Sequence, residues 1–196
     1  MCIRDKYIEV DKNGNVAVKD DYMDDIYLGS VFPKYNLAWR NDFNYKGINL
    51  GVLFTARIGG ICYSATQANM DLYGVSEASA AARDAGGVMI NGRDMIDAQK
   101  WYQVIGSQSG LPQYYTYSAT NVRLQELSLG YTLPSKWFRD KMRMTVSFVG
   151  RNLWMIYCKA PFDPEAVAST GMNYQGIDYF MMPSMRNLGF NVKFQF

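Results

Sequence analysis

The last nine residues of the chain, 188–196, alternate between apolar side chains and side chains that are polar or absent. Leu188, Phe190, Val192, Phe194 and Phe196 occupy the even positions, and Gly, Asn, Lys and Gln occupy the odd ones. Successive side chains of a β-strand point to opposite faces of its sheet. The segment therefore predicts a strand with one wholly apolar face and one polar face.

Four further segments show a similar alternation: 36–45, 48–58, 121–133 and 141–152. Each spans about 10–13 residues, whereas strands of soluble proteins average roughly 5–6. A tilted strand that crosses a bilayer needs about that greater length, with one face toward lipid and the other toward a polar lumen. We predict an all-β fold made of antiparallel strands of a transmembrane outer-membrane β-barrel, about five in number.

The connections between these strands alternate between short and long. Lys46-Gly47 predicts a tight hairpin turn within 36–58, and residues 134–140 form a short link within 121–152. The segments 59–120 and 153–185 are long, and we expect them, together with 1–35, to be extracellular loops. Ser76 predicts the N-cap of a short helix over 76–84 in the first of them. The terminal strand is expected over 186–196.

The composition excludes several classes of chemistry. The chain has no His, which removes His-based catalytic triads and His metal ligands. Its three cysteines are Cys2, Cys62 and Cys158, whose wide spacing does not suggest a disulfide framework. A net charge of +2 gives no strong attraction to nucleic acid. Neither a signal peptide nor a transmembrane helix is evident. Because a barrel protein needs a secretory signal, either the barrel interpretation is wrong or this chain is a piece of a longer protein.

Two short motifs carry carboxylates that could do chemistry. Asp163 and Glu165 flank a proline, but a glycosidase places its two carboxylates across a cleft, so we expect a turn. The stretch that begins at Asp11 starts like a calcium loop, yet Val16 occupies the position that needs glycine, and a turn is again the better interpretation. We therefore predict no catalytic, cofactor-binding or metal-binding residues and no enzymatic activity.

Aromatic residues make up 15% of the chain, and many lie near the ends of the predicted strands. Because such rings favour the membrane–water boundary, we expect five of them to be anchors: Trp39, Tyr45, Tyr131, Trp137 and Trp154. A second group lies in the long loop, where contact with ligand or partner and packing within the loop both remain open. This group consists of Tyr102, Tyr114, Tyr115 and Tyr117.

Several stretches together resemble the C-terminal end of SusC/RagA-type TonB-linked outer-membrane receptors. Residues 122–134, V-R-L-Q-E-L-S-L-G-Y-T-L-P, are similar to a strand motif of that family. Four other stretches are similar to shorter family motifs: Lys46–Leu50, Arg57–Gly60, Gly150–Leu153 and Phe162–Glu165. A final one, Met182–Arg186, precedes the last strand as its counterpart does in the family.

The resemblance implies a large barrel of about 22 strands that encloses a plug. It implies uptake of a glycan or peptide beneath a SusD-type surface lipoprotein, driven by TonB through the missing N-terminal part. Outer-membrane lipid would surround the barrel. Because about five strands cannot close such a barrel, we expect this chain to be a C-terminal portion of the receptor, in the cell outer membrane.

One alternative belongs to a different class of protein. A soluble all-β carbohydrate-binding or adhesion module would also contain two-faced strands and many aromatics. Such a module would bury the even-numbered face of 188–196 against other elements. A further alternative, a small self-contained barrel, needs at least about eight strands. The five predicted strands are too few for it unless several chains associate.

Overall fold

The computed structural model describes residues 7–12, 14–19, 27–90, 94–108, 110–138, 141–168, 171 and 174–195. The chain forms two compact units, each assembled from separate stretches of sequence. A helical unit comprises 1–31, 61–118 and 166–181, and a sheet unit comprises 32–60, 119–165 and 182–196. No helix within the described ranges is both long enough and apolar enough to cross a membrane.

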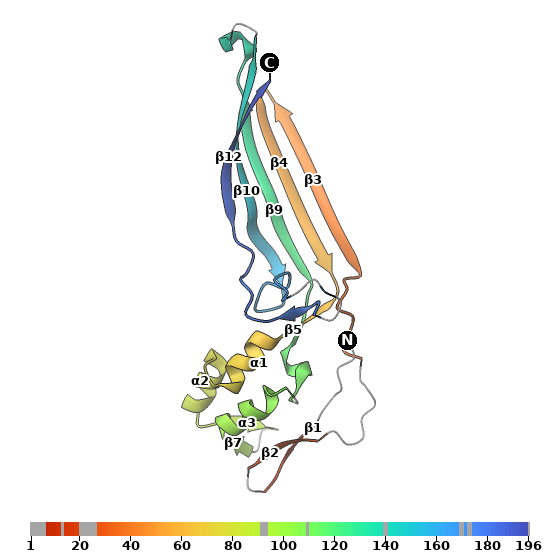
Figure 1. Ribbon diagram of the computed structural model, residues 1–196, viewed down its shortest axis with the longest axis vertical. Helices are drawn as coiled ribbons and strands as arrows, with labels where there is room; N and C mark the ends of the chain where they lie inside the picture. The colour runs from red at the N-terminus through yellow and green to blue at the C-terminus, as the bar shows by residue number, and fades with distance from the viewer. Residues whose placement is uncertain are drawn as a thin grey trace. The chain divides into compact units, whose positions relative to one another are not determined.

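The sheet unit is built on five long antiparallel strands, which lie side by side in Figure 1. Their order across the sheet is β12-β10-β9-β4-β3. Their bounds are β3 Tyr35–Tyr45, β4 Ile48–Ile58, β9 Asn121–Thr132, β10 Arg143–Cys158 and β12 Asn187–Gln195. The short 3-10 helix η2, Ser135–Phe138, lies between β9 and β10. The predicted antiparallel strands are thus confirmed, and Phe196 lies outside the described residues.

The hairpin between β3 and β4 turns at Lys46 and Gly47, as the sequence predicted. Both residues have positive φ, 46° and 88°, which suits the twist of a two-residue hairpin. The turn backbone also reaches the next strand, since Gly47 accepts a hydrogen bond from the Thr132 amide at 2.7 Å. The turn therefore fixes the register of three neighbouring strands at this end.

Strand β10 is longer than the segment 141–152 that alternation predicted, because it continues to Cys158. The alternation breaks at Asn152, which has a left-handed φ of 51°. The register between β10 and β9 shifts between Arg151 and Trp154. Such a bulge adds a residue without ending the strand, and a strict period of two cannot follow the strand past it.

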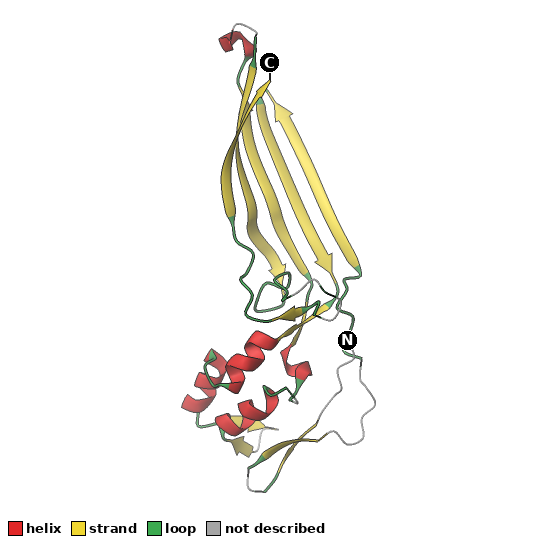
Figure 2. Cartoon of the chain, viewed as in Figure 1, coloured by secondary structure: helices red, strands yellow, loops and turns green. Residues whose placement is uncertain are grey.

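The helical unit contains all three α-helices of the described residues, shown in red in Figure 2. They are α1 Ala65–Leu72, α2 Glu77–Asp84 and α3 Ala98–Ile105, with the 3-10 helix η1 at Pro112–Tyr115. Short strands accompany them: β1 Tyr7–Val10, β2 Val16–Lys19, β5 Ile61–Ser64, β6 Val88–Ile90, β7 Asp94–Ile96, β8 Thr116–Ser118 and β11 Ile177–Asp178.

The predicted helix in the long segment 59–120 is confirmed as α2. The Ser76 side chain caps it by accepting a hydrogen bond from the Ser79 amide at 3.0 Å. Helices α1 and α3 were not predicted, although Ser64 and Asp97 cap them in the same way. The segment 1–35, predicted as a loop, contains the β1–β2 hairpin, whose four-residue strands are too short for alternation to reveal.

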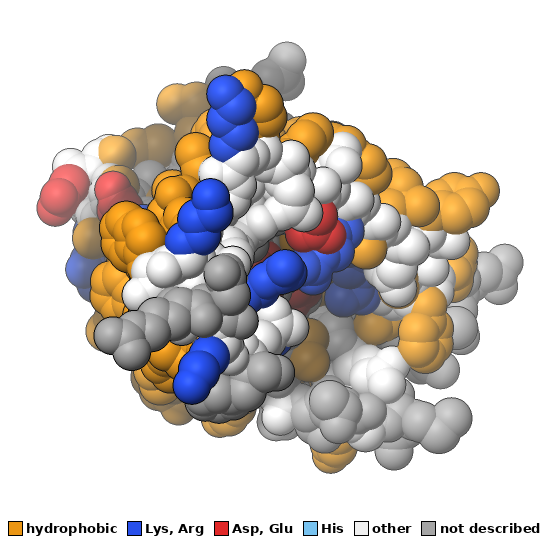
Figure 3. Space-filling model, turned by 90° about the horizontal axis from the view of Figure 1, so that it is seen from above, with side chains coloured by type: hydrophobic (Ala, Val, Ile, Leu, Met, Phe, Trp, Pro, Cys, Tyr) orange, Lys and Arg blue, Asp and Glu red, His pale blue; other side chains and the backbone are white. Residues whose placement is uncertain are grey.

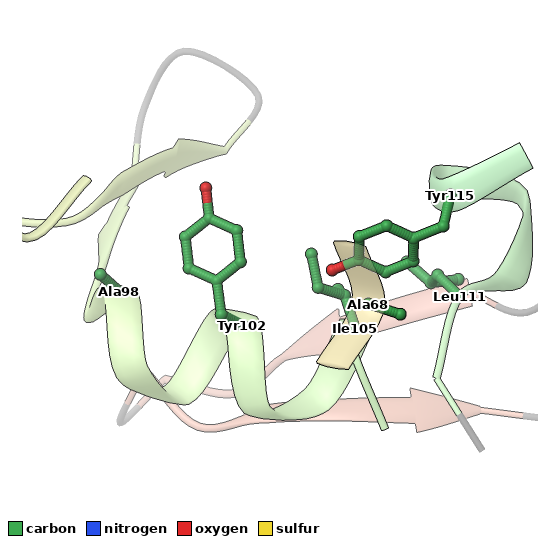
Figure 4. Packing of buried hydrophobic residues seen from close by; sticks show 6 residues of the cluster. All are labelled: Ala68, Ala98, Tyr102, Ile105, Leu111 and Tyr115. Atoms are coloured by element: carbon green, nitrogen blue, oxygen red, sulfur yellow. The ribbon is translucent and has the colours of Figure 1, made fainter. Parts of the chain in front are cut away.

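The core of the helical unit lies between α1, α3 and η1. Figure 4 shows Tyr115 lying over Ile105 and Ala68, with Leu111 beside them, while Tyr102 projects from α3. Tyr115 is 1% exposed, and its hydroxyl donates to the buried carboxylate of Asp71 at 2.9 Å. Burial and the neighbouring Asp71 raise the pKa of Tyr115, so the tyrosine stays a hydrogen-bond donor.

Candidate functional site

An apolar row runs straight across the sheet. The register pairs Phe190 with Phe148, Phe148 with Leu129, Leu129 with Leu50, and Leu50 with Phe43. Four of these five side chains are exposed although they are large and apolar, from 39% for Phe148 to 81% for Phe190, and Leu50 is partly buried. A soluble sheet buries such a face against other elements. The sheet therefore presents its apolar face outward, as the wall of a membrane barrel does.

A second apolar row lies beyond the bulges and continues the same face. Trp154 pairs with Leu124, Leu124 with Phe54, and Phe54 with Trp39. Trp39 stacks on Phe54 with ring centroids 5.6 Å apart. Leu124 and Leu129 of β9 are five positions apart, so strict alternation would place them on opposite faces, and the register shift of β9 against β4 keeps both on this face.

The opposite face of the sheet is polar and charged. Arg151 lies opposite Glu126, and their side chains form an ion pair with Nε 3.0 Å from Oε2. Arg40 of β3 approaches the same Glu126 at 3.9 Å and pairs with Asp42 at 2.9 Å. In the space-filling view of Figure 3, Lys and Arg side chains gather toward the middle, and hydrophobic side chains occupy much of the margin.

A buried polar cluster, here called the Arg123 clasp, lies at the end of β9 beyond the bulge. Arg123 is 2% exposed, and its Nη2 lies 2.9 Å from Asp163 Oδ1 and 3.3 Å from Glu165 Oε2. Its other nitrogens donate to the side-chain oxygens of Asn121 and Asn152. Because a buried guanidinium is costly unless paired, these acceptors stabilise it.

The clasp also holds the segment that precedes the terminal strand. Asp163 Oδ2 accepts hydrogen bonds from both the amide and the hydroxyl of Ser184. Asn152, in its left-handed conformation, donates to the Ser184 carbonyl at 2.9 Å. The cluster thereby joins β9, the bulge of β10 and the segment that leads into β12.

The electrostatics of the clasp keep Asp163 ionised. Burial by itself raises the pKa of a carboxyl group, but the hydrogen bonds from Ser184, the Glu165 amide and Arg123 outweigh it. The pKa of Asp163 is therefore lowered. The hydrogen bonds that the structure shows for Asp163 join it to Arg123, to the Glu165 amide and to Ser184. The carboxylate therefore links segments of the fold to one another.

The Arg123 clasp brings together residues from motifs that are far apart in the sequence. Arg123 comes from the 122–134 motif, Asn152 from Gly150–Leu153, Asp163 and Glu165 from Phe162–Glu165, and Ser184 from Met182–Arg186. Asp163 and Glu165 were expected to form a turn, and Asp163 does accept from the Glu165 amide at 3.0 Å. Arg123, Asn152 and Ser184 were missed as partners, because the bulges hide which residues share a face.

The remaining candidate residues lie outside the Arg123 clasp. Asp11 forms the turn of the β1–β2 hairpin, where both its carboxylate oxygens accept from Asn15; Asn13 of that stretch lies outside the described residues. Tyr102 and Tyr115 are buried in the helical core, whereas Tyr114 is 50% exposed. All five aromatics expected as anchors are exposed, from 45% for Tyr131 to 72% for Trp137.

Comparison with known proteins agrees with this architecture. No protein-family model matches the sequence. The chain is 25% identical over 198 residues to TonB-dependent receptor P3 of Formosa agariphila, an alignment that covers 96% of this chain and 19% of that protein. Its fold matches the RagAB peptide importer in the open-open state, with a TM-score of 0.60, 17% identity, and coverage of 96% of this chain and 21% of the other.

A second structure, of the RagAB peptide transporter, gives a TM-score of 0.58 at 17% identity and covers 97% of this chain and 21% of that one. The chain thus spans about a fifth of the length of each protein that it matches. These similarities confirm the predicted fold of antiparallel strands, which is consistent with part of a barrel wall. They also confirm the resemblance to SusC/RagA-type receptors that the sequence motifs indicated.

Proposed function

We propose that this chain forms part of the barrel wall and outer loops of an outer-membrane receptor for nutrient uptake, and that it has no enzymatic activity of its own. The observation that carries the proposal is the open apolar row from Phe190 to Phe43. A sheet with this face in water would aggregate through it. Lipid is the environment that this face suits.

The length of the face fits a bilayer. Tyr35 and Tyr45 both lie on the apolar side of β3, at its two ends, ten residue steps apart. At about 3.4 Å per step, ten steps span ~34 Å along the strand. A strand tilted by roughly 40° would then cover a height of ~26 Å, close to the ~25 Å apolar band of such barrels. The two tyrosines would sit at opposite membrane boundaries.

The wider mechanism follows the proteins that the chain resembles. In the proposed receptor, the sheet unit forms wall and the helical unit belongs to the extracellular loops. A glycan or peptide would be held between those loops and a SusD-type surface lipoprotein. Entry would then be energised by TonB, acting through a part of the receptor that precedes this chain.

The placement in lipid can be tested with a fluorophore on each face of one strand. In a background with its cysteines replaced by serine, Leu129→Cys and Ser128→Cys variants would carry the same environment-sensitive dye in lipid vesicles. We expect brominated lipids to quench the dye at position 129 and leave position 128 nearly unchanged. Equal quenching at both positions, or quenching at neither, would contradict the proposed wall.

The uptake role requires a second experiment in intact cells. Labelled oligosaccharides and oligopeptides would be followed into cells that contain or lack the receptor, with and without a functional TonB. We expect receptor-dependent accumulation of one of the two classes, and its loss without TonB. Accumulation that does not depend on the receptor would remove the uptake role but leave the membrane placement intact.

A further inference from the structure

The two units of the chain carry net charges of opposite sign. The stretches that form the sheet unit contain 13 Lys and Arg against 5 Asp and Glu. Those of the helical unit contain 7 Lys and Arg against 13 Asp and Glu. The small net charge of the whole chain, +2, therefore conceals a strongly basic sheet unit. Basic surfaces attract anionic partners where their charges are not already paired.

Part of this excess lies at the end of the sheet that carries the short connections, here called the basic end. Its charged residues lie in the turn between β3 and β4 and around the link between β9 and β10: Lys46, Lys136, Lys141 and Arg143. All charged residues that the structure describes in 45–48 and 131–144 are basic, and no ion pair between described residues involves them. Arg139 and Asp140 balance one another in charge and lie outside the described residues. Figure 3 views the chain from this end, where Lys and Arg side chains are prominent.

The turn is joined to the last row of the apolar face. Tyr45 pairs with Ile48, and Ile48 pairs with Tyr131, so these three side chains close the apolar face at the basic end. Their exposed fractions are 68%, 48% and 45%. The ammonium Nζ of Lys46 lies 5.2 Å from the centroid of the Tyr45 ring, within the range of cation–π attraction. The Lys46 charge is thus held beside the apolar face.

We propose that the basic end binds the headgroup of an anionic phospholipid, such as phosphatidylglycerol. The inference rests on the proposed placement of the sheet in lipid, with Tyr45 at the membrane boundary. The headgroup layer extends roughly 5–7 Å beyond the hydrocarbon on each side of a bilayer. A lysine one position past the boundary can extend its charged tip into that layer. Lys46 therefore meets the phosphate, and the neighbouring basic residues favour a lipid with net negative charge.

The aromatic residues at this end favour lipid over a soluble polyanion. Trp137 follows Lys136 in η2 and is 72% exposed. An indole ring suits the membrane boundary, because its apolar body contacts acyl chains and its N–H can donate to a headgroup oxygen. Tyr45 and Tyr131 have the same division between an apolar ring and a polar tip. A phospholipid offers phosphate and hydrocarbon together, whereas a soluble polyanion offers only charge.

The test compares two lipids around one dye. In the background with cysteines replaced by serine, Ile48→Cys would carry an environment-sensitive dye in phosphatidylcholine vesicles. A small fixed fraction of the lipid would be brominated, as either phosphatidylglycerol or phosphatidylcholine. We expect stronger quenching by brominated phosphatidylglycerol, with a relative association constant of at least about five, since one basic residue at an anionic surface contributes about fivefold.

Variants at the two ends of β3 give a matched comparison. Lys46→Asn removes the charge and keeps the turn, because Asn-Gly suits a two-residue hairpin with positive φ. It should lower the preference for phosphatidylglycerol about fivefold. Lys136→Gln probes the same end from the other connection and should act in the same direction. Lys34→Asn, an exposed lysine beside Tyr35 at the opposite end of β3, should change the preference at position 48 less than twofold.

Three results would overturn the headgroup site and leave the membrane wall standing. The first is equal quenching by the two brominated lipids, and the second is an equal effect of Lys46→Asn and Lys34→Asn. The third is association of soluble polyglutamate with the protein in phosphatidylcholine vesicles that is as strong and as dependent on Lys46. Quenching by neither brominated lipid would overturn the wall and the headgroup site together.

Discussion

Arg123 and Asp163 form a buried ion pair, 2.9 Å from Nη2 to Oδ1, between residues forty positions apart in the sequence. The side chain of Arg123 is 2% exposed and that of Asp163 is 9% exposed. Glu165 also approaches the guanidinium, but its side chain is 39% exposed. The two carboxylates are thus unequal partners of one cation, and only one of them also holds Ser184.

This inequality predicts different costs for two conservative substitutions. Asp163→Asn should lower the free energy of unfolding by about 3–5 kcal/mol, because it leaves the Arg123 charge buried with one exposed counter-ion. Glu165→Gln should cost no more than about 1 kcal/mol, as for a solvent-screened pair. Urea unfolding in detergent, followed by far-UV circular dichroism, measures both.

A paired substitution tests whether the cost comes from the unpaired charge. Arg123→Met combined with Asp163→Leu removes both charges and should be less destabilising than Asp163→Asn alone. If the double variant is less stable than Asp163→Asn, the unpaired Arg123 charge is not the main cost, and the hydrogen bonds of the two side chains contribute more to stability.

The same group gives a pH dependence. The pKa of Asp163 is lower in the folded protein than its usual value, so its contribution to stability is present above the usual pKa of an aspartate, about 3.9. The contribution should decline as the pH falls below that value toward the lowered, folded-state pKa. We expect the acid-induced loss of stability to be smaller in Asp163→Asn than in the unmodified protein, measured by urea unfolding at a series of pH values.

Alternation sufficed to predict the sheet because each strand has one lipid-type face and one polar face. Phe190, Phe148 and Leu129 are all at positions where a period of two holds, and the register places them in one row. The same logic fails beyond Arg151, where the bulges shift β9 and β10. Arg123 and its partners therefore could not be assigned to one face, although their motifs were visible.

Helical structure in the segment 59–120 was predicted only where a cap stood before an Ala-rich stretch, at Ser76. Helices α1 and α3 are eight residues each, too short for a helical period to be distinct. Asp71 and Tyr115 lie 44 positions apart, and no local sequence pattern indicates that their side chains will form a hydrogen bond in the core. Tertiary contacts decide such pairs, and these contacts require the fold.

The hydrogen bond between Asp71 and Tyr115 predicts that the Tyr115 hydroxyl stabilises the helical core. Tyr115→Phe should lower the free energy of unfolding by about 1–3 kcal/mol, because it removes a donor from a buried carboxylate. Tyr114→Phe, next in the chain and 50% exposed, is the control and should stay within about 0.5 kcal/mol. Hydrogen exchange of α1 and α3 amides reports the change locally; equal protection in both variants would refute it.

The turn conformation of Gly47 predicts that adding a single methyl group there destabilises the fold. Gly47 has φ +88°, and an added Cβ would lie 2.9 Å from the Thr132 carbonyl oxygen. Gly47→Ala should therefore lower the free energy of unfolding by at least about 1–2 kcal/mol. At Gly189 on β12 an added Cβ meets nothing within 4 Å, so Gly189→Ala should be tolerated. Urea midpoints of the two variants that agree within error would show that the turn can relax.

Neighbouring residues on β12 give the sharpest test of which face meets lipid. Phe190 continues the apolar row and packs edge-on against Phe148, with ring centroids 5.4 Å apart, whereas Asn191 lies on the polar face opposite Ser147. Phe190→Lys should reduce the yield of folded protein in outer membranes strongly, since a lysine at mid-depth costs roughly 2–4 kcal/mol. Asn191→Lys adds the same charge to the same strand and should change the yield little. Resistance of the folded barrel to SDS at room temperature measures both, and equal losses would reverse the assignment of the two faces.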